Sequence, residues 1–311
     1  MKLLTNKLLE TFCAVVDCGG FTDAQYKLGL TQSAISCRIR DLEVILGYRV
    51  CERGRRGFYL TERGQIAYDK AQSILRSVRD FDTELLELRQ VITGDLRVGL
   101  VDAVSSLPEL NLSSAIERFY ARTDQVRLEL IIASPVELTQ RLISGSLHIG
   151  IAPFRNRVSD LSYVELFSEE HSLYCGQTHP LYAAPAETIT AEVLSGYPVC
   201  QRTYDLSLTA DWSKMGPLAY VSNMEAVFVL VSSGRFLGAL PDHYAKTWVE
   251  RGELRLLCAD SFSWVSKFYL ATRPESARRR AVDLFIQDIL QTIEKTKSEG
   301  ASAAVCRVPA H

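Results

Sequence analysis

The sequence lacks any apolar run long enough to cross a membrane. Its longest clean apolar stretches, such as Ala226 to Val231, fall far short of the about 18 residues that a bilayer requires. The amino terminus also lacks the apolar core of a signal peptide, because Lys7 and Glu10 interrupt the early leucines. We therefore expect no transmembrane helix, no signal peptide and a cytoplasmic location.

Motifs that support common enzyme chemistry are missing too. The sequence has no Gly-x-Ser-x-Gly elbow, no Walker loop and no Gly-x-Gly-x-x-Gly turn. Its eight cysteines form no Cys-x-x-Cys pair and no Cys/His array with metal-ligand spacing. We therefore expect no enzyme activity, no metal and no cofactor, and we interpret the cysteines as reduced and mostly buried thiols.

The composition is that of a globular protein with an uneven charge distribution. The 311 residues are 47% hydrophobic and 23% charged, and this length allows two or three cores. Residues 1–60 contain nine Lys and Arg against six Asp and Glu, whereas the remainder contains 26 against 31. A basic head on an acidic body favours binding to a polyanion such as nucleic acid.

The amino-terminal segment predicts three short helices. Apolar residues recur at helical spacing up to Cys18, where two glycines follow. Thr22 and Thr31 are N-cap candidates for the next two helices, which should end at Gly29 and Gly47. A helix, a glycine-containing turn and a second amphipathic helix are typical of a helix-turn-helix.

A β-ribbon wing should follow these helices. Residues 49–53 and 57–60 have the pattern of short strands, and they flank the basic tip Gly54-Arg55-Arg56. If Ile35 points into the core, the opposite helix face carries short polar side chains that can bond base edges. The residues expected to contact DNA are Thr31, Gln32, Ser33, Ser36, Cys37, Arg40, Arg53, Arg55 and Arg56. The alternative is that this polar face is merely solvated.

A long helix is predicted from Thr61, its N-cap, to about Gln90. Its apolar positions are spaced four and three residues apart over nearly four heptads, which favours a two-helix coiled coil. The residues expected to form the dimer contact are Ala71, Ile74, Val78, Phe81, Leu85 and Leu88. The alternative is a long helix that lies across its own domain.

From Asp95 onward the pattern alternates between strand and helix. Such βα units imply a parallel sheet with right-handed crossovers, arranged here as two α/β lobes with a ligand between them. In the first set, strands are expected at 96–101, 126–132 and 147–152, and helices at 110–120 and 135–143. The second set of strands and helices comprises residues 163–167, 171–175, 199–202, 224–232 and 237–240. A strand at 264–271 and a helix at 277–293 are expected at the end of the chain.

The residues resemble the LysR-type transcriptional regulators over about 3–295. The resemblance is carried by Leu30-Thr31-Gln32-Ser33-Ala34-Ile35-Ser36, Ile39-Arg40-Asp41-Leu42-Glu43, Leu46-Gly47, Glu52-Arg53 and Leu60-Thr61-Glu62-Arg63-Gly64. Further matches are His179-Pro180-Leu181 and the segment from Gly234 to Pro241.

The resemblance implies a winged helix-turn-helix, a linker coiled coil and a two-lobed α/β effector domain similar to periplasmic binding proteins. It also implies a dimer of dimers, with double-stranded operator DNA, a small-molecule effector of unknown identity and RNA polymerase as partners. The implied domains are 1–60 for DNA binding, 61–92 for the linker helix, 93–163 with 268–295 for the first lobe, 164–267 for the second and 296–311 for a tail.

The resemblance also selects a set of candidate effector contacts. They are Asp102, Ser105, Ser134, Gln201, Arg202, Thr203 and Asn223. Asp102 departs from the hydroxyl residues usual in the family. If its carboxylate is unpaired, the effector should carry a hydrogen-bond donor or a positive group; if it pairs with Arg202, the cleft can close without a ligand. His148 stands where the family usually has Asp, and we interpret it as a local hydrogen-bonding substitute.

Two other functions compete with an effector-controlled regulator. An enzyme on the same two-lobed fold would need the motifs that are missing. A regulator with a thiol switch would need Cys200 to meet Cys175 or Cys258 in space, because no resolving cysteine is close in the sequence.

Overall fold

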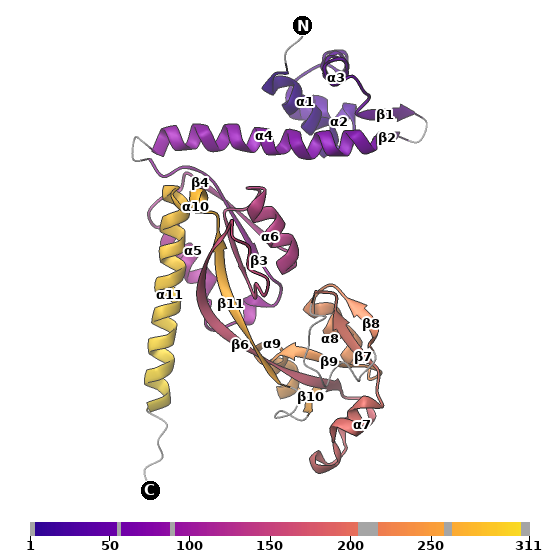
Figure 1. Ribbon diagram of the computed structural model, residues 1–311, viewed down its shortest axis with the longest axis vertical. Helices are drawn as coiled ribbons and strands as arrows, with labels where there is room; N and C mark the ends of the chain where they lie inside the picture. The colour runs from indigo at the N-terminus through magenta and orange to yellow at the C-terminus, as the bar shows by residue number, and fades with distance from the viewer. Residues whose placement is uncertain (1–3, 55–56, 88–90, 205–216, 258–262, 306–311) are drawn as a thin grey trace. The chain divides into compact units, whose positions relative to one another are not determined.

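The computed structural model describes the chain except for residues 1–3, 55–56, 88–90, 205–216, 258–262 and 306–311. The chain divides into two compact units, Met1–Gly94 and Asp95–His311 (Figure 1). The segment predicted to bind DNA and the long helix predicted as a separate linker thus belong to one unit. No helix among the described residues is long and apolar enough to span a membrane.

The first unit begins with three helices around one core. They are α1 Asn6–Asp17, α2 Phe21–Leu28 and α3 Gln32–Leu46. Gly29 and Gly47 follow α2 and α3 with φ of 63° and 77°, as expected of glycines that end helices. Thr31 caps α3 as predicted, since its Oγ1 accepts a hydrogen bond from the Ala34 amide at 3.3 Å. Thr22 is no cap, because α2 already begins at Phe21.

The wing and the long helix complete this unit. The strands β1 Cys51–Gly54 and β2 Gly57–Leu60 pair antiparallel, as predicted, and α4 extends over Glu62–Glu87. Thr61 Oγ1 accepts a hydrogen bond from the Gly64 amide at 2.9 Å, so the predicted cap is present. A Cβ atom on Gly64 would lie 1.8 Å from the Val50 carbonyl oxygen, so only glycine fits at this crossing.

The second unit contains a mixed sheet with the strand order β4-β3-β5-β11-β6-β9-β7-β8 and β10 beside β6. Its first lobe consists of β3 Gly94–Leu100, β4 Val126–Ile132, β5 Ile149–Ala152, α5 Leu112–Tyr120, α6 Pro135–Ile143 and α11 Arg280–Val305. Its second lobe consists of β7 Val199–Arg202, β8 Pro217–Val221, β9 Leu237–Pro241, β10 Leu254–Leu257, α7 Ala191–Ser195, α8 Met224–Ser232 and α9 Asp242–Glu250. Short helices are η1 Val104–Ser106, η2 Pro180–Tyr182, η3 Ala186–Thr188 and α10 Pro274–Ala277.

Two long antiparallel strands, β6 Ser162–Gly176 and β11 Trp264–Thr272, run through both lobes (Figure 1). The prediction of two separate strands at 163–167 and 171–175 is therefore wrong, because the residues between them continue the pairing with β11. Strand β3 pairs parallel with β5, and β7 pairs parallel with both β8 and β9. The predicted lobe boundaries fall inside β6 and β11.

Helices cover the sheet of each lobe. In the first lobe α11 packs on α5 and α6 packs on β5, and in the second α8 packs on β7 and β9. The strand β8 and the helices α7 and α9 were not predicted, and α11 extends past the expected end at residue 293. Helix α5 starts at Leu112 rather than Leu110, because Asn111 caps it through a hydrogen bond from the Ser114 amide.

Candidate functional site

The helix α3 presents its predicted polar face to the surface of the first unit. Ile35, Ile39 and Leu42 are 0 to 1% exposed and lie in the core. The residues that were expected on the opposite face, Gln32, Ser33, Cys37 and Arg40, are exposed, and Ser36 is half-buried.

The amino-terminal tip of α3 is held in place by local hydrogen bonds. The Oγ1 atom of Thr31 lies 3.0 Å from Ser33 Oγ, and the Gln32 amide donates to Gln25 Oε1 at 3.2 Å. Gln25 lies on α2, so the first helix of the pair fixes the start of the second.

The wing is anchored on the helices at its root. The Phe58 ring packs edge-on against Phe21 of α2 with ring centroids 5.9 Å apart. The backbone of Arg53 pairs opposite Phe58 in the ribbon. The side chain of Arg53, and the whole of Arg55 and Arg56, lie outside the described residues.

The residues of α4 that were expected to form the dimer contact fall into two groups. Ala71 is only 2% exposed in the core formed with α1 and α3, so its contacts lie within the chain and not in the expected dimer contact. Ile74, Phe81 and Leu85 are 43 to 58% exposed, and Val78 is half-buried. Leu88 lies outside the described residues. The exposed part forms an apolar stripe along the helix that the first unit leaves uncovered.

In the second unit, Asp102 connects the two lobes. It follows β3, and its Oδ2 accepts a hydrogen bond from the backbone amide of Met224, the first residue of α8. Its Oδ1 lies 3.5 Å from the Tyr204 hydroxyl, which in turn accepts from Arg202 at 3.2 Å. The helix N-terminus stabilises the negative charge. Asp102 is therefore not the unpaired cleft carboxylate that was considered, and Tyr204 links it to Arg202.

A second contact between the lobes starts from the neighbouring helix η1. The hydroxyl of Ser106 lies 3.0 Å from Nδ1 of His243 on α9. His243 Nε2 lies 2.9 Å from Glu169, and His171 Nε2 lies 2.6 Å from the other oxygen of the same carboxylate. Burial raises the pKa of Glu169, but the hydrogen bonds from His171 and His243 outweigh it and lower that pKa to about 2.

The other candidate effector contacts have varied environments. Ser134 and Asn223 are N-caps of α6 and α8, and they accept from the amides of Glu137 at 3.3 Å and Ala226 at 2.8 Å. Ser105 and Thr203 are exposed, and Gln201 is half-buried. The residues that the sequence did not indicate are Tyr204, Met224, Ser106, His243, Glu169 and His171. Their contacts join segments far apart in the chain, so no local spacing could have shown them.

Two cavities adjoin at Tyr204. The larger has a volume of about 420 Å³ and lies against α6 and the segment after β5. Its lining comprises Pro135, Val136, Thr139, Gln140, Pro153, Phe154, Arg155, Asn156, Val158 and Tyr204. The smaller, of about 10 Å³, lies between Asp102, Glu169, His171 and Arg202. Of these two cavities, the larger has room for an organic molecule and the smaller does not.

The two described cysteines of the predicted thiol switch do not favour it. Cys175 and Cys200 are buried, and burial raises the pKa of their thiols to about 11 and about 12. A thiol that stays protonated reacts slowly with peroxide. Cys258 lies outside the described residues. In the same described part of the chain, no group of His, Cys, Asp and Glu could hold a metal ion.

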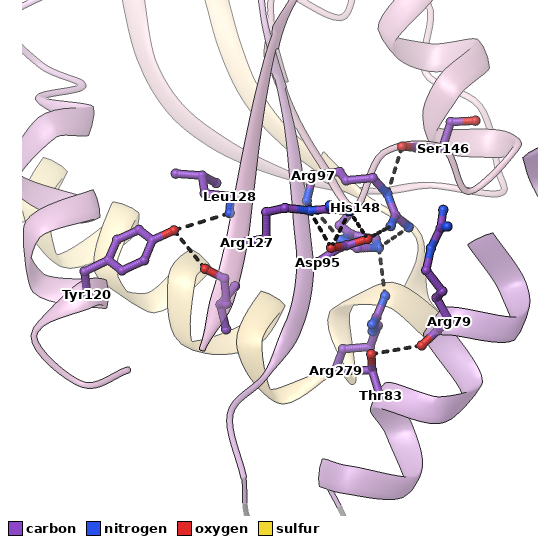
Figure 2. Close-up of polar contacts among 11 residues, drawn as sticks. Arg79, Thr83, Asp95, Arg97, Tyr120, Arg127, Leu128, Ser146, His148 and Arg279 are labelled. Atoms are coloured by element: carbon purple, nitrogen blue, oxygen red, sulfur yellow. Dashed lines mark hydrogen bonds and ion pairs between the residues drawn. The ribbon is translucent and has the colours of Figure 1, made fainter. Parts of the chain in front are cut away.

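His148 lies in a buried cluster of arginines, away from the cleft. Its Nε2 accepts hydrogen bonds from Arg97 at 2.6 Å and Arg279 at 2.8 Å (Figure 2). Arg97 also pairs with Asp95 at 3.7 Å, and Asp95 is shared with Arg127. The expected role of His148 as a hydrogen-bonding substitute agrees with these contacts.

Both units match family models. The model for the bacterial regulatory helix-turn-helix protein, lysR family, matches residues 6–65, and the model for the LysR substrate binding domain matches residues 89–294. The HTH-type transcriptional activator BauR of Pseudomonas aeruginosa is 32% identical over 286 residues, which cover 91% of this chain and 93% of BauR. The SDS degradation transcriptional activation protein of a Pseudomonas strain is 28% identical, with 80% and 83% of the two chains covered.

Solved structures share the fold. CbnR, a LysR family transcriptional regulator solved in complex with its target DNA, aligns with a TM-score of 0.66 at 18% identity and covers 93% of this chain and 100% of that one. CrgA, a LysR-type transcriptional regulator from Neisseria meningitidis, aligns with a TM-score of 0.51 at 24% identity and covers 95% and 99%. The order of a winged helix-turn-helix, a long helix and a two-lobed α/β domain is common to them.

Proposed function

The chain belongs to the LysR family of transcriptional regulators, and from this premise we propose which of its residues bind DNA, join the subunits and bind the effector. It is a DNA-binding regulator with an effector-binding domain. We further propose that it acts in the cytoplasm without enzyme activity, and that it contacts RNA polymerase when bound to its operator.

Operator recognition is assigned to α3 and the wing. The observation that carries this proposal is the division of α3 into a buried apolar face and an exposed face of short polar side chains. Gln32 and Ser33 stand at its amino-terminal tip, where recognition helices meet base edges. The arginines of the wing, Arg53, Arg55 and Arg56, would contact phosphates and position the head.

A comparison of specific with random DNA tests this assignment. An operator is first selected from a pool of random duplexes with the full-length wild type, and affinities are then measured for both kinds of duplex. Gln32→Ala should lose about 1 to 3 kcal/mol on the operator and little on random DNA. The double variant Arg55→Ala/Arg56→Ala should weaken both and flatten the salt dependence. Gln125→Ala, in the second unit, is the matched control.

Equal losses of Gln32→Ala on the operator and on random DNA would show that this face of α3 does not read sequence. The polar face would then be a solvated surface, and base recognition would have to come from another element.

Subunit contact is assigned to the exposed part of the α4 stripe. Ile74, Val78, Phe81 and Leu85 retain the heptad spacing, and burying such a stripe against a second copy removes apolar surface from water. Ala71 is left out of the contact because it packs inside its own unit.

Effector binding is assigned to the region where the two lobes meet. The hydrogen bonds of Asp102 and Ser106 to α8 and α9 show that the lobes touch there, and the large cavity lies beside these contacts. A ligand at this place can change how the lobes pack, which is what control of the regulator requires.

A further inference from the structure

We infer that the packing of the two lobes responds to pH, because the contact between Ser106 and His243 is complete when the His243 imidazole carries a proton on both nitrogens. This inference goes beyond the proposed function, since it requires no effector. It concerns the contact between η1 and α9, which is separate from the contact of Asp102 with the Met224 amide.

The Ser106 hydroxyl has two neighbours that can accept its single proton. Its Oγ lies 3.1 Å from the Ala103 carbonyl oxygen and 3.0 Å from Nδ1 of His243. If Nδ1 carries no proton, the hydroxyl has to donate to one of these two atoms and leave the other. If Nδ1 is protonated, it donates to the Ser106 oxygen, and the hydroxyl donates to Ala103. Both hydrogen bonds therefore form together when His243 is protonated.

The other ring nitrogen of His243 is bound to a carboxylate. Nε2 lies 2.9 Å from Oε1 of Glu169, whose side chain is 6% exposed. Burial raises the pKa of Glu169, but the hydrogen bonds from His171 and His243 lower it to about 2, so the carboxylate is ionised. Because an ionised carboxylate can accept but not donate, Nε2 carries a proton. An additional proton on His243 therefore goes to Nδ1, the nitrogen that faces Ser106.

His171, the second histidine on this carboxylate, is poorly placed to take up a proton. Its Nε2 lies 2.6 Å from Oε2 of Glu169, so that nitrogen is also the donor. Its Nδ1 is buried and has no hydrogen-bond partner among the described residues. The ring stacks on Trp264 with centroids 5.0 Å apart and an angle of 7° between the planes. A proton on Nδ1 would thus be a buried donor without an acceptor, which is unfavourable.

The elements packed against α9 carry other titratable and charged groups. The neighbouring Asp242 accepts hydrogen bonds from Ser172 at 3.2 Å and Tyr174 at 2.8 Å, both on β6. On β10, Arg255 donates to three backbone carbonyls, and the sequence of β9 has no titratable side chain. The small cavity beside Glu169 and His171 adds Asp102 and Arg202. Histidine is the residue type whose ordinary pKa lies between about pH 5 and pH 8, so a change of charge in that range falls on histidine.

The direction of the effect follows from these contacts. Protonation of His243 strengthens the contact between the lobes, and by linkage the contact favours protonation. In weak acid the imidazolium makes charge-assisted hydrogen bonds to Glu169 and Ser106, whereas at alkaline pH a neutral imidazole makes a weaker bond to Ser106. The difference corresponds to a factor of about ten in an equilibrium constant. The lobes should therefore be held together more firmly at about pH 6 than at about pH 8.5.

Amide hydrogen exchange of the full-length protein, measured by mass spectrometry, tests this inference. Peptides that contain residues 103–107 are followed, because the Ser106 and Leu107 amides donate to carbonyls within this segment. Ser106→Ala removes the hydroxyl from an exposed residue, and His243→Gln replaces the imidazole by a group that does not titrate. Variants are compared with each other at one pH, so the intrinsic pH dependence of exchange cancels. Unchanged far-ultraviolet circular dichroism confirms that each variant is folded.

A double-mutant cycle at each pH isolates the contact. It compares the effect of Ser106→Ala in the wild type with its effect in His243→Gln, at about pH 6 and about pH 8.5. In the wild type, we expect Ser106→Ala to accelerate exchange about tenfold more at the lower pH than at the higher. In His243→Gln the acceleration should be the same at both. Ser113→Ala, which changes an exposed serine of α5, is the matched control and should show no dependence on His243.

Three results would overturn the inference. The same acceleration by Ser106→Ala at both pH values in the wild type would show that the proton does not strengthen the contact. A larger acceleration at the higher pH would show that the neutral imidazole is the favoured partner of Ser106. Equal acceleration in the wild type and in His243→Gln would show that His243 does not hold Ser106. DNA is absent from these measurements, so none of the three results bears on the proposed operator contacts.

Discussion

Replacing His148 by Asp should stabilise the second unit, and the gain should be larger in weak acid. His148 is 1% exposed and accepts hydrogen bonds from Arg97 and Arg279. Burial, together with the charges of Arg97, Arg279 and Arg273, lowers the pKa of His148 to about 2. The imidazole therefore stays neutral in the folded protein and offers the arginines no negative charge.

The magnitude follows from proton linkage. In the unfolded chain His148 titrates near its ordinary pKa of about 6.5. Below that pH the unfolded state therefore binds a proton at His148, whereas the folded state does not. The contribution of His148 to the free energy of unfolding is therefore fully present above about pH 6.5. It decreases as the pH falls toward the pKa of His148 in the folded protein. At pH 5 the loss is about 2 kcal/mol, since each pH unit contributes about 1.4 kcal/mol.

An aspartate at position 148 removes this loss and adds a counter-charge. Asp is ionised above its unfolded pKa of about 3.9, so at both pH 8 and pH 5 it can accept charge-assisted hydrogen bonds from the two arginines. We expect a gain of about 1 to 3 kcal/mol at pH 8 and about 2 kcal/mol more at pH 5.

Urea unfolding at pH 8 and pH 5, followed by tryptophan fluorescence, measures the effect. His148→Asn is the matched control, because it removes the titrating group without adding a charge. Its pH dependence should resemble that of His148→Asp, but its stability at pH 8 should not rise. If wild type and His148→Asp lose the same stability between pH 8 and pH 5, the linkage argument is refuted.

Three further predictions concern the contacts between elements. Asp102→Ala removes a charge-assisted hydrogen bond of about 2 kcal/mol, so the Met224 amide should exchange its hydrogen about thirtyfold faster by mass spectrometry, whereas unchanged exchange would mean that the bond does not hold the lobes. The double variant Val78→Asp/Phe81→Asp places charges on the α4 stripe and should sediment as a monomer; an unchanged assembly would place the subunit contact elsewhere. Gly64→Ala forces a Cβ atom against a backbone carbonyl and should destabilise the first unit by about 2 kcal/mol or more in thermal unfolding followed by circular dichroism, and a neutral effect would contradict the close crossing.

Local patterns predicted the elements whose signals lie in neighbouring residues. Thr31 was recognised as a cap because an exposed hydroxyl precedes an amphipathic run, and Gly47 as an end because only glycine adopts positive φ without cost. The buried direction of Ile35 follows from the 3.6-residue period alone. These features need no knowledge of the rest of the fold.

Features that depend on distant segments could not be predicted. The partner of Asp102 is an amide more than one hundred residues away, and the sequence offered Arg202 as the more obvious choice. The continuity of β6 is decided by pairing with β11 and not by its own composition. Ala71 has the heptad spacing of a dimer seam, yet a neighbouring core within the same unit buries it first.

The strand pair β6 and β11 determines what kind of motion an effector can induce. A two-stranded ribbon resists stretching along its length but changes its twist easily. The pairing register shifts between Phe268 and Tyr269, beside the stacked rings of Phe167 and Phe268 at 4.9 Å, and such irregularities increase the local twist of a strand pair. We therefore expect the two lobes to rotate relative to each other about the long axis of the β6–β11 pair. A small change in the twist of this pair then produces a large displacement at the edge of the second lobe that lies farthest from it.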